Sequence, residues 1–416
     1  MQTNLADFIK GTPDGDEAEA ILRACVHCGF CTATCPTYQL LGDELDGPRG
    51  RIYLIKQVLE GAEATRKTQL HLDRCLTCRN CESTCPSGVK YGRLVDIGRR
   101  VVEERVPRTL GNRLKRHTLK EFLPRTGLFK LAHRTGSLAR PLLSKNLQDK
   151  LQPAPAAGRW PTRSHARKML VLGGCVQPAM APNINAAAAR VLDAVGVQLF
   201  VAPKAGCCGA VRYHMNDQAG GLDDMRRNID AWWPYVEQVE AIVMTASGCG
   251  VTVKEYGHLL AQDPAYAAKA ARISLLTRDL AEILPQFEAQ LALQVKQGVN
   301  GRDGRRVAFH PPCTLQHGQQ IRGKVEGVLR AAGIDVALCA DSHLCCGSAG
   351  TYSVLHPEIA HELRNRKLAN LEATGAPEIV SANIGCVSHL QAGTGTPVSH
   401  WIELLDRLLA TPPAAA

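Results

Sequence analysis

Residues 25–36 read Cys25-Val-His-Cys28-Gly-Phe-Cys31-Thr-Ala-Thr-Cys35-Pro36, and residues 75–86 repeat the same spacing from Cys75 to Pro86. Three cysteines separated by two residues each, then a fourth after three residues and followed by proline, is the ferredoxin spacing that holds pairs of [4Fe–4S] clusters. Such clusters pass single electrons, so the repeated motif indicates an electron carrier.

In this motif the fourth cysteine turns away and ligates the other cluster, so we predict two interleaved ligand sets. The first set is Cys25, Cys28, Cys31 and Cys85, and the second is Cys75, Cys78, Cys81 and Cys35. Two structural zinc sites are the alternative, which the spacing disfavours because zinc sites usually combine two separated pairs of ligands. We expect His27, inside the first motif, to fill the loop.

The remaining cysteines follow an internal repeat. Cys175, Cys207-Cys208-Gly209 and Cys249 recur as Cys313, Cys345-Cys346-Gly347 and Cys386. The offsets are 313 − 175 = 138, 345 − 207 = 138 and 386 − 249 = 137. Three agreeing offsets indicate two duplicated domains, which we expect to be related by a pseudo-two-fold axis.

Each repeat offers one candidate metal site. A disulfide between adjacent cysteines is strained, so we expect each pair to join a single site, with the following glycine allowing close backbone approach. The candidate ligands are Cys175, Cys207, Cys208 and Cys249 in the first repeat, and Cys313, Cys345, Cys346 and Cys386 in the second. A further iron–sulfur cluster, a structural zinc, a thiol/disulfide pair and a site kept in one repeat only remain open.

Four other residues near these motifs have weaker assignments. Cys339 fits no motif, and we predict a buried apolar thiol. His310, His317 and His343 lie near the second cysteine pair, where any of them could ligate a metal or carry a proton. A histidine in such a loop is more often a hydrogen-bonded structural residue.

The pattern of apolar residues predicts a multidomain α and α/β protein. Short apolar runs leading to the cysteines predict strands, and longer periodic stretches predict helices. The predicted strands are 168–172, 197–201, 241–245, 306–309, 334–338 and 378–381, and the predicted helices of the repeats are 183–195 and 319–332. Alternating strands and helices indicate two small parallel α/β domains, with the cysteines just after strand ends.

The N-terminal part has a different pattern. Residues 49–60 and 65–74 read as helices, and alternation of β-branched residues is absent, so we expect a helical ferredoxin domain with two [4Fe–4S] sites. The predicted domains are the ferredoxin domain at 1–105, a basic helical segment and Pro/Ala-rich linker at 106–166, and the two α/β repeats at 167–300 and 301–416.

The net charge is concentrated in one segment. Between Arg105 and Lys150, twelve Lys and Arg stand against two acids, which gives 12 − 2 = +10, and the whole chain gives 49 − 39 = +10. Basic amphipathic helices suit an anionic lipid surface or an acidic partner protein. A linker whose apolar stripe packs on its own domains is the third interpretation, and the absence of a known reader motif argues against nucleic acid.

Several protein classes are disfavoured. Residues 1–22 carry five acids and no apolar core, so we expect no secretion signal and a reducing, cytoplasmic location. No run reaches the roughly 18 apolar residues of a spanning helix, so membrane contact would be peripheral, at the inner face of the plasma membrane. No G-x-G-x-x-G follows a strand, so we expect no flavin in this chain and a flavoprotein partner that delivers the electrons.

Five stretches resemble the family of iron–sulfur subunits of bacterial glycolate oxidases. They are 24–51, Ala205-Gly-Cys-Cys-Gly-Ala210, Asn228-Ile-Asp-Ala-Trp-Trp-Pro234, Thr245-Ala-Ser-Gly-Cys-Gly250 and Ser342-His-Leu-Cys-Cys-Gly-Ser-Ala-Gly-Thr351. The resemblance implies a complex with FAD-binding subunits that oxidises glycolate to glyoxylate. This chain would carry the electrons to a quinone or another membrane acceptor and would hold no catalytic residue itself.

The cysteine-pair modules, called CCG domains, are also similar to those of heterodisulfide reductases and of subunits for glycerol-3-phosphate and lactate oxidation. A thiol/disulfide redox subunit, or a subunit of one of those dehydrogenases, is therefore the alternative. Full CCG motifs end in C-x-x-C, whereas here Ala246 and Asn383 replace the first cysteine of that pair. Four thiols remain in each repeat, which leaves a cubane cluster or a structural metal open.

Overall fold

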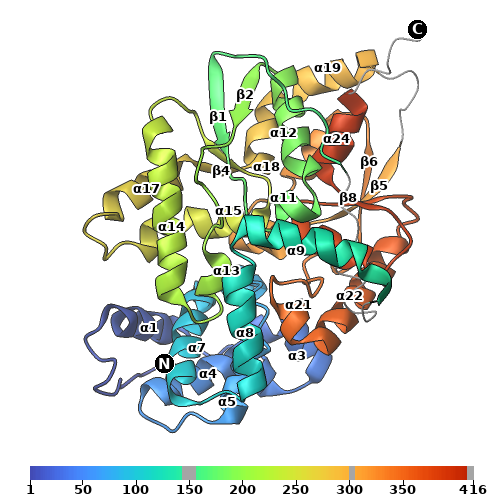
Figure 1. The fold of residues 1–416 in the computed structure, drawn as a ribbon. Helices are drawn as coiled ribbons and strands as arrows, with labels where there is room; N and C mark the ends of the chain where they lie inside the picture. Colours follow the sequence, from blue (N-terminus) through green and yellow to red (C-terminus); the bar gives the residue numbers. More distant parts are fainter. Residues whose placement is uncertain (143–155, 299–304, 410–416) are drawn as a thin grey trace.

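The computed structural model describes residues 1–142, 156–298 and 305–409. The N-terminal part is helical, and Figure 1 shows it in blue below the two repeats; within the described residues up to 142 no strand is present. Its elements are α1 (Pro13–Ala24), α2 (Phe30–Ala33), α3 (Pro36–Leu41), η1 (Glu44–Asp46), α4 (Pro48–Leu59), α5 (Arg66–Asp73), α6 (Asn80–Thr84) and α7 (Tyr91–Arg105). The prediction of a helical ferredoxin domain is confirmed.

The long helices α4 and α7 build the core of this domain. Proline at the first position of α4 has a backbone angle that suits a helix start, and Gly61, with φ of 100°, ends the segment. Ile55 and Leu59 of α4 and Leu94 of α7 are completely buried in one cluster. This cluster also contains Cys25, Cys75 and Cys81, so the helices fix the two cysteine motifs relative to each other.

The two repeats each contain a four-stranded parallel sheet. The first has β1 (Arg167–Val171), β2 (Val197–Phe200), β3 (Ile242–Met244) and β4 (Thr277–Asp279) in the order β2-β1-β3-β4. The second has β5 (Arg306–His310), β6 (Asp335–Leu338), β7 (Ile379–Ser381) and β8 (Val398–His400) in the order β6-β5-β7-β8. The identical strand order confirms the predicted duplication. The short edge strands β4 and β8 were not predicted, because Thr-Arg-Asp and Val-Ser-His lack an apolar run.

Helices cover both sheets. The first repeat has α11 (Gln177–Met180), α12 (Asn183–Ala194), α13 (Ala210–Tyr213), α14 (Gln218–Trp232), η3 (Trp233–Tyr235), α15 (Ser247–Lys254), α16 (Tyr256–Leu259), α17 (Ala267–Leu276), α18 (Leu280–Ile283), η4 (Leu284–Phe287) and α19 (Glu288–Gly298). The second has η5 (Thr314–Gly318), α20 (Lys324–Ala331), α21 (Tyr352–Leu355), α22 (Pro357–Glu372), α23 (Ile384–Gln391) and α24 (Trp401–Leu409). Helix α20 begins five residues later than predicted, because a π-helical turn and Gly323, with φ of 73°, precede it.

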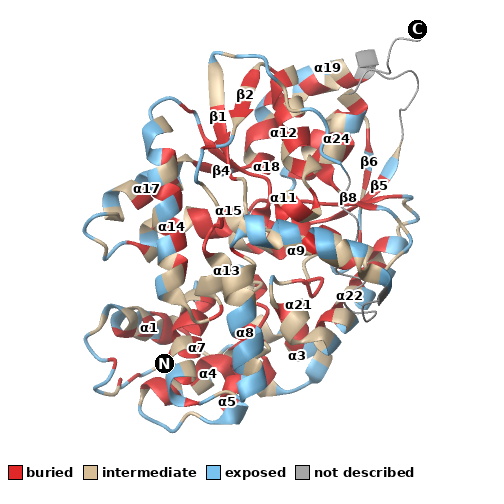
Figure 2. Cartoon of the chain, in the orientation of Figure 1, coloured by how far each residue is buried: buried red, intermediate tan, exposed pale blue. Residues whose placement is uncertain are grey.

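The repeats share one hydrophobic core. Helix α12 of the first repeat packs against α24 of the second, and α20 of the second packs reciprocally against α19 of the first. Trp401, Leu192 and Phe309 lie in this common cluster, each at most 1% exposed, and Figure 2 shows the buried residues continuing from one repeat into the other. The reciprocal packing is the arrangement expected for the predicted pseudo-two-fold axis.

The basic segment forms two helices, α8 (Leu110–Phe122) and α9 (Thr126–Leu138), followed by η2 (Arg140–Leu142). We call α8 and α9 the strap, because Figure 1 shows them crossing the face where the ferredoxin domain meets the repeats. Arg116 and His133 are its buried residues, and Thr126 Oγ1 donates to Gly174 O at 3.1 Å. The remainder of the basic segment, 143–155, lies outside the described residues.

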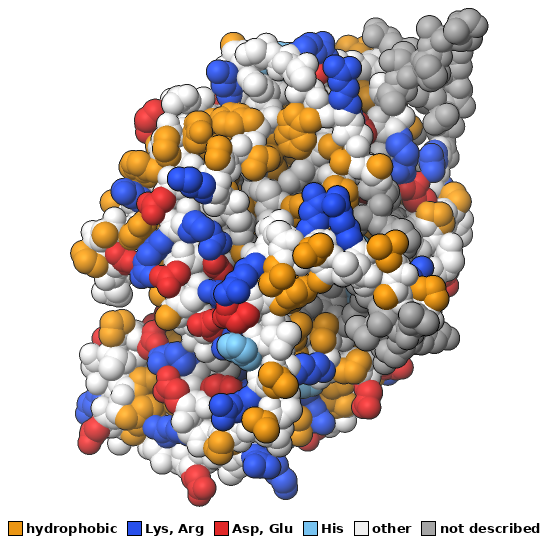
Figure 3. Space-filling view, in the orientation of Figure 1, with side chains coloured by type: hydrophobic (Ala, Val, Ile, Leu, Met, Phe, Trp, Pro, Cys, Tyr) orange, Lys and Arg blue, Asp and Glu red, His pale blue; other side chains and the backbone are white. Residues whose placement is uncertain are grey.

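The strap turns much of its apolar surface outward. Five leucines are between 44% and 85% exposed, namely Leu110, Leu114, Leu128, Leu131 and Leu138. Figure 3 shows apolar and basic side chains next to each other on this face. The apolar stripe is therefore only partly used to pack on the chain's own domains. None of the helices in the described ranges has the length and hydropathy to cross a membrane.

Candidate metal centres and the cavity between them

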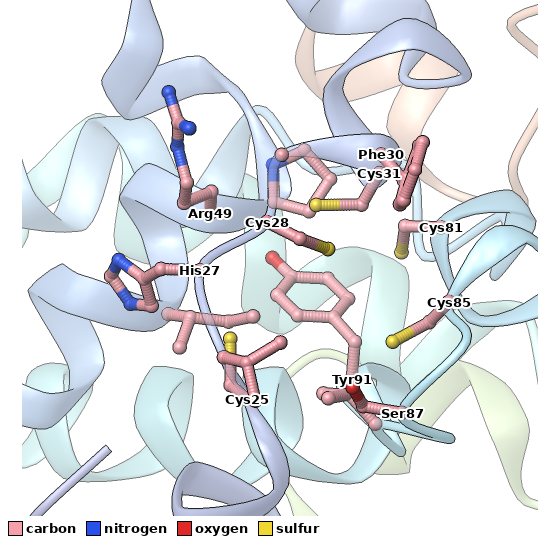
Figure 4. Close-up of a pocket in the computed structure, with 15 residues that line it drawn as sticks. Cys25, His27, Cys28, Phe30, Cys31, Arg49, Cys81, Cys85, Ser87 and Tyr91 are labelled. Atoms are coloured by element: carbon pink, nitrogen blue, oxygen red, sulfur yellow. The ribbon is translucent and has the colours of Figure 1, made fainter.

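The first predicted ligand set lines one small cavity. Cys25, Cys28, Cys31 and Cys85 surround a volume of about 30 Å³, which we call the cluster-1 cavity. Figure 4 shows their sulfurs converging around the Tyr91 ring, with Cys81 at one side. Cys28 is exposed whereas Cys25 is buried, so this cavity lies close to the protein surface.

The second predicted set lines a neighbouring cavity of about 20 Å³, the cluster-2 cavity. Its sulfurs belong to Cys35, Cys75, Cys78 and Cys81. Tyr91 and Cys81 belong to the walls of both cavities, so the two lie directly side by side. The fourth cysteine of each motif thus lines the cavity formed by the first three cysteines of the other motif.

The backbone around both cavities adopts matching left-handed conformations. His27 and Gly29 have φ of 56° and 85°, and the equivalent Thr77 and Arg79 have φ of 51° and 58°. Left-handed non-glycine residues are costly and concentrate at functional sites. They curl the chain so that three sulfurs point inward, and the Thr77 N–H donates to Cys75 Sγ at 3.3 Å.

The donor set fits a cationic cluster. Burial raises the pKa of the Cys31 thiol to about 11 and holds that of Cys81 well above its ordinary value. Without a cation, such thiols stay protonated near neutral pH. A bound iron cluster favours the thiolate form and takes four of them, which is the number that each cavity offers.

A buried guanidinium lies in the wall of the cluster-2 cavity. Arg51 is 1% exposed and donates to Thr37 Oγ1 at 3.1 Å and to Asp46 Oδ1 at 3.3 Å. Thr37 Oγ1 in turn lies 3.3 Å from Cys35 Sγ. Asp46 balances the charge of Arg51, but Arg74 also pairs with Asp46 at 2.8 Å, so two guanidiniums face one carboxylate. The net positive charge that remains would favour a reduced cluster in this cavity.

In the first repeat, four cysteines gather where strands β1, β2 and β3 end. Hydrogen bonding to Cys207, then burial, raises the pKa of Cys175 well above its ordinary value. The Cys208 thiol contacts those of Cys207 and Cys249. The four sulfurs therefore form one continuous group, which we call the first-repeat site.

The second repeat reproduces this arrangement. Cys345 contacts Cys313 and Cys346, and hydrogen bonds from Cys345 and Cys386 lower the pKa of Cys346. Asn383 Nδ2, at the position where a full CCG motif has cysteine, donates to Cys386 Sγ at 3.6 Å. An amide in place of a fifth thiolate can hold a sulfur in position but is a poor iron ligand.

The glycine of each CCG triplet has a steric reason. Gly209 and Gly347 have φ of 89° and 87°, a region that disfavours other residues. A Cβ atom on Gly209 would lie 2.6 Å from Gly221 O, and one on Gly347 would lie 2.4 Å from Ala360 O. Only glycine lets these cysteine pairs approach α14 and α22 so closely.

The histidines near the second cysteine pair differ in their contacts. His317 Nδ1 lies 3.0 Å from Ser83 Oγ and its Nε2 lies 2.9 Å from His343 O, so it joins the second repeat to the ferredoxin domain. His310 Nδ1 lies 3.0 Å from Ser381 Oγ, and the His310 ring also hydrogen-bonds with Cys346, so its predicted role as a ligand or proton carrier stays a prediction. Cys339 is 6% exposed in an apolar cluster.

A larger cavity, the central cavity, lies where the ferredoxin domain and the two repeats meet. Its volume is about 310 Å³. Its wall contains cysteine sulfurs from three sources, namely Cys75 and Cys78 of the ferredoxin domain, Cys175, Cys208 and Cys249 of the first repeat, and Cys313, Cys345, Cys346 and Cys386 of the second. Sequence reasoning missed this cavity, because it joins segments that are far apart in the chain.

Sequence reasoning also missed the residues that support the cysteines. Asn228 Nδ2 donates to Cys207 O at 2.7 Å, and its Oδ1 accepts from the Gly206 N–H at 2.8 Å. Tyr256 Oη donates to Cys208 O at 2.9 Å, and its ring stacks on Trp232 at 6.5 Å between centroids. Asn228 and Trp232 both lie in the stretch 228–234 that carries part of the family resemblance. The spacing of residues in that stretch does not reveal that they support the cysteines.

Comparison with known proteins gives two family matches. The family described as "4Fe-4S dicluster domain" matches residues 21–89, and the family described as "Cysteine-rich domain" matches residues 169–254 and 307–391. The glycolate oxidase iron-sulfur subunit of Escherichia coli K12 is 54% identical over 413 residues, covering 98% of this chain and 99% of that protein.

Two further relatives are more distant. The probable glycolate oxidase iron-sulfur subunit of Bacillus subtilis 168 is 30% identical over 411 residues, covering 91% of this chain and 90% of that protein. Lactate utilization protein A of Bacillus licheniformis is 25% identical over 238 residues, covering 56% of this chain and 96% of that protein.

Proposed function

The chain belongs to the family of glycolate oxidase iron–sulfur subunits, and on that premise we propose how it carries electrons within a glycolate-oxidising complex. It is an electron-transfer iron–sulfur subunit. In our proposal, FAD-binding partner subunits oxidise glycolate to glyoxylate, and this chain takes the electrons one at a time. In this proposal the flavin and the catalytic residues belong to the partner subunits.

Two [4Fe–4S] clusters would be held by the ferredoxin cysteines. Cys25, Cys28, Cys31 and Cys85 would bind cluster 1, and Cys75, Cys78, Cys81 and Cys35 would bind cluster 2. The observation that carries this proposal is the pair of adjoining four-sulfur cavities with Cys81 and Tyr91 in their common wall. Adjoining clusters are close enough for rapid transfer of single electrons between them.

The surroundings of the two cavities suggest a direction. Cluster 1 would receive electrons from the flavoprotein, since Cys28 is exposed and Val26 and Phe30 beside it are 67% and 62% exposed. Cluster 2 would pass them onward, since Cys75 and Cys78 also line the central cavity. The net positive charge of Arg51, Arg74 and Asp46 would favour reduction of cluster 2, which supports this order.

Each repeat site would bind one further metal centre, a cubane or a zinc ion, through its four cysteines. Zinc and iron–sulfur clusters both favour thiolate ligands, and the contacts among the thiols support a single centre in each site. The strap would lie against the anionic inner face of the plasma membrane. Its five exposed leucines among basic residues are the reason for this choice over an acidic partner protein.

The metal content of the anaerobically purified chain tests the proposal. Two cubanes correspond to about eight irons, and filled repeat sites add about four each, or zinc instead. Cys28→Ser and Cys78→Ser should each remove roughly four irons and one of the two ferredoxin paramagnetic signals. Cys339→Ser is the matched control, a buried cysteine outside the four sites, and should retain all iron. A colourless wild-type protein would refute the proposal.

A further inference from the structure

A buried hydroxyl group lies between the two ferredoxin cavities. Tyr91 is 3% exposed, begins helix α7 and lines both the cluster-1 and the cluster-2 cavity. Its Oη atom has no hydrogen-bond partner among the described residues. A buried hydroxyl without a partner costs free energy, and folded proteins rarely leave one in that state. Tyr91 therefore needs an acceptor inside the cavities that it lines.

We propose that the Tyr91 hydroxyl donates a hydrogen bond to a sulfur of cluster 2 and thereby raises the reduction potential of that cluster. This inference rests on the proposed function, because the acceptor belongs to a cluster held by the ferredoxin cysteines. The hydroxyl keeps its proton throughout: one electron enters the cluster and leaves it again, and no covalent bond changes. Tyr91 sets a potential and takes no part in the chemistry on glycolate.

The charged groups that act on the hydroxyl identify cluster 2 as the acceptor. Burial raises the pKa of Tyr91 well above its ordinary value, and the charges that also act on it are, in descending order, those of Cys75, Arg51, Cys81 and Arg99. Cys75 and Cys81 are two of the predicted ligands of cluster 2. Arg51 lies in the wall of the cluster-2 cavity, and Arg99 donates to Cys75 O at 2.6 Å. None of these four groups is a predicted ligand of cluster 1.

The other hydroxyl groups in the wall of the cluster-2 cavity already have partners. They belong to Thr37 and Thr77. Thr37 Oγ1 donates to Asp46 O at 2.8 Å, and Thr77 Oγ1 accepts from the Arg99 guanidinium at 3.0 Å. Within the described part of the chain, Tyr91 is therefore the hydroxyl in this wall that is left to serve the cluster.

The second ferredoxin motif holds Tyr91 in place. The Tyr91 N–H donates to Val89 O at 3.0 Å, and the N–H of the next residue, Gly92, donates to Glu82 Oε1 at 2.5 Å. Glu82 directly follows Cys81 in the sequence. The first turn of α7 is thus tied to the motif that supplies the cluster-2 ligands, and the hydroxyl is positioned before a cluster binds.

A hydrogen bond to a cluster sulfur favours the reduced state. The added electron makes the sulfurs more negative, and a proton donor stabilises that charge, most strongly where water is excluded. The net positive charge of Arg51, Arg74 and Asp46 acts on the same cluster in the same direction. Two separate features therefore raise the potential of cluster 2, and both favour electron transfer from cluster 1 to cluster 2.

Redox titration of the metal-loaded chain, followed by electron paramagnetic resonance, tests the inference. In a Cys28→Ser background cluster 2 is titrated alone. Tyr91→Phe keeps the ring and removes the hydroxyl, so at a fixed potential the ratio of reduced to oxidised cluster 2 should fall about tenfold, a shift of about 59 mV for one electron. Tyr53→Phe is the matched control, because Tyr53 is 47% exposed and lines neither cavity, and it should leave the potential unchanged.

The hydroxyl proton gives a second measurement that does not depend on potentials. A proton that is hydrogen-bonded to a sulfur of reduced cluster 2 couples to the unpaired electron. Electron–nuclear double resonance of the wild type should show such a coupling, and it should disappear after exchange into D2O. Tyr91→Phe should lack this coupling in ordinary water, whereas Tyr53→Phe should retain it.

The outcomes separate this inference from the proposed function. The inference is overturned if Tyr91→Phe leaves the potential of cluster 2 at the wild-type value, if only cluster 1 shifts, or if the wild type shows no exchangeable coupling at cluster 2. In each of these cases two loaded ferredoxin clusters leave the proposed function standing. A wild-type chain without the two ferredoxin signals would overturn the proposed function, and this inference with it.

Discussion

The Arg79 guanidinium donates hydrogen bonds to both carboxylate oxygens of Glu255, at 2.5 and 2.8 Å. Arg79 stands between Cys78 and Cys81 in the second ferredoxin motif, and Glu255 ends the helix that carries Cys249 of the first-repeat site. The two side chains are only 11% and 23% exposed. One ion pair between mostly buried side chains therefore joins the cluster-2 cavity to the first repeat.

Removing this ion pair should weaken the docking of the ferredoxin domain. Arg79→Met leaves the Glu255 carboxylate partly buried without its partner, and we expect unfolding to require about 2–4 kcal/mol less free energy. Urea unfolding of the metal-loaded protein measures the effect. Arg366→Met is the control, because its ion pair with Glu362 is about half exposed and should contribute less than about 1 kcal/mol. Equal losses in both variants would contradict the interface role.

Gly209 should not tolerate alanine. The new Cβ would meet Gly221 O at 2.6 Å in a left-handed backbone, so we expect a loss of roughly 2–4 kcal/mol and less metal at the first-repeat site. Gly196→Ala is the control that measures the cost of the left-handed backbone alone, because Gly196 has φ of 79° with nothing within 4 Å of the added Cβ. Thermal unfolding and metal analysis of both variants make the comparison, and Gly209→Ala must be the more damaged of the two.

Asn228 should be a positioning residue for the first cysteine pair. Asn228→Ala removes the donor to Cys207 O and the acceptor for the Gly206 N–H in a buried place, which should lower stability by about 2–4 kcal/mol. Metal bound by the first repeat should fall while the two ferredoxin signals persist. Asn370→Ala, which removes an exposed bond to Ala340 O, serves as the control. Unchanged metal content in Asn228→Ala would show that the pair holds its position without the amide.

His400 should make stability depend on pH. Burial lowers its pKa to about 4, while its Nε2 lies 2.9 Å from Thr245 O of the other repeat. The unfolded chain binds the proton near pH 6.5 and the folded chain does not, so this contribution is complete above 6.5 and is lost as pH falls toward 4. We expect a loss of roughly 1 kcal/mol between pH 7.5 and 5.5.

His400→Gln should flatten that part of the pH profile, because glutamine does not titrate. Unfolding in urea at several pH values measures the slope for the wild type and the variant. His117→Gln, at an exposed histidine of α8, should leave the slope unchanged. A wild-type slope in His400→Gln would assign the pH dependence to other groups.

The local pattern of the chain predicted most of the fold. Ferredoxin spacing and strand-ending cysteines are properties of short segments, so the helical domain and the two parallel sheets followed from them. The start of α20 and the strands β4 and β8 did not follow, because a π-helical turn and three-residue edge strands leave no periodic apolar signal. The exposure of the strap leucines could not be predicted either, since an amphipathic pattern does not reveal which surface covers its apolar side.

By itself, the sequence predicts which cysteines belong together, because ligand spacing within each motif is a matter of a few backbone angles. It also determined that the repeats are duplicates. Only the tertiary structure decided that Cys78 and Cys313 line one cavity, because their proximity depends on how three independently patterned parts pack. Contacts such as Arg79 with Glu255 and Asn80 with His343 O set that packing, and no local rule of spacing contains them.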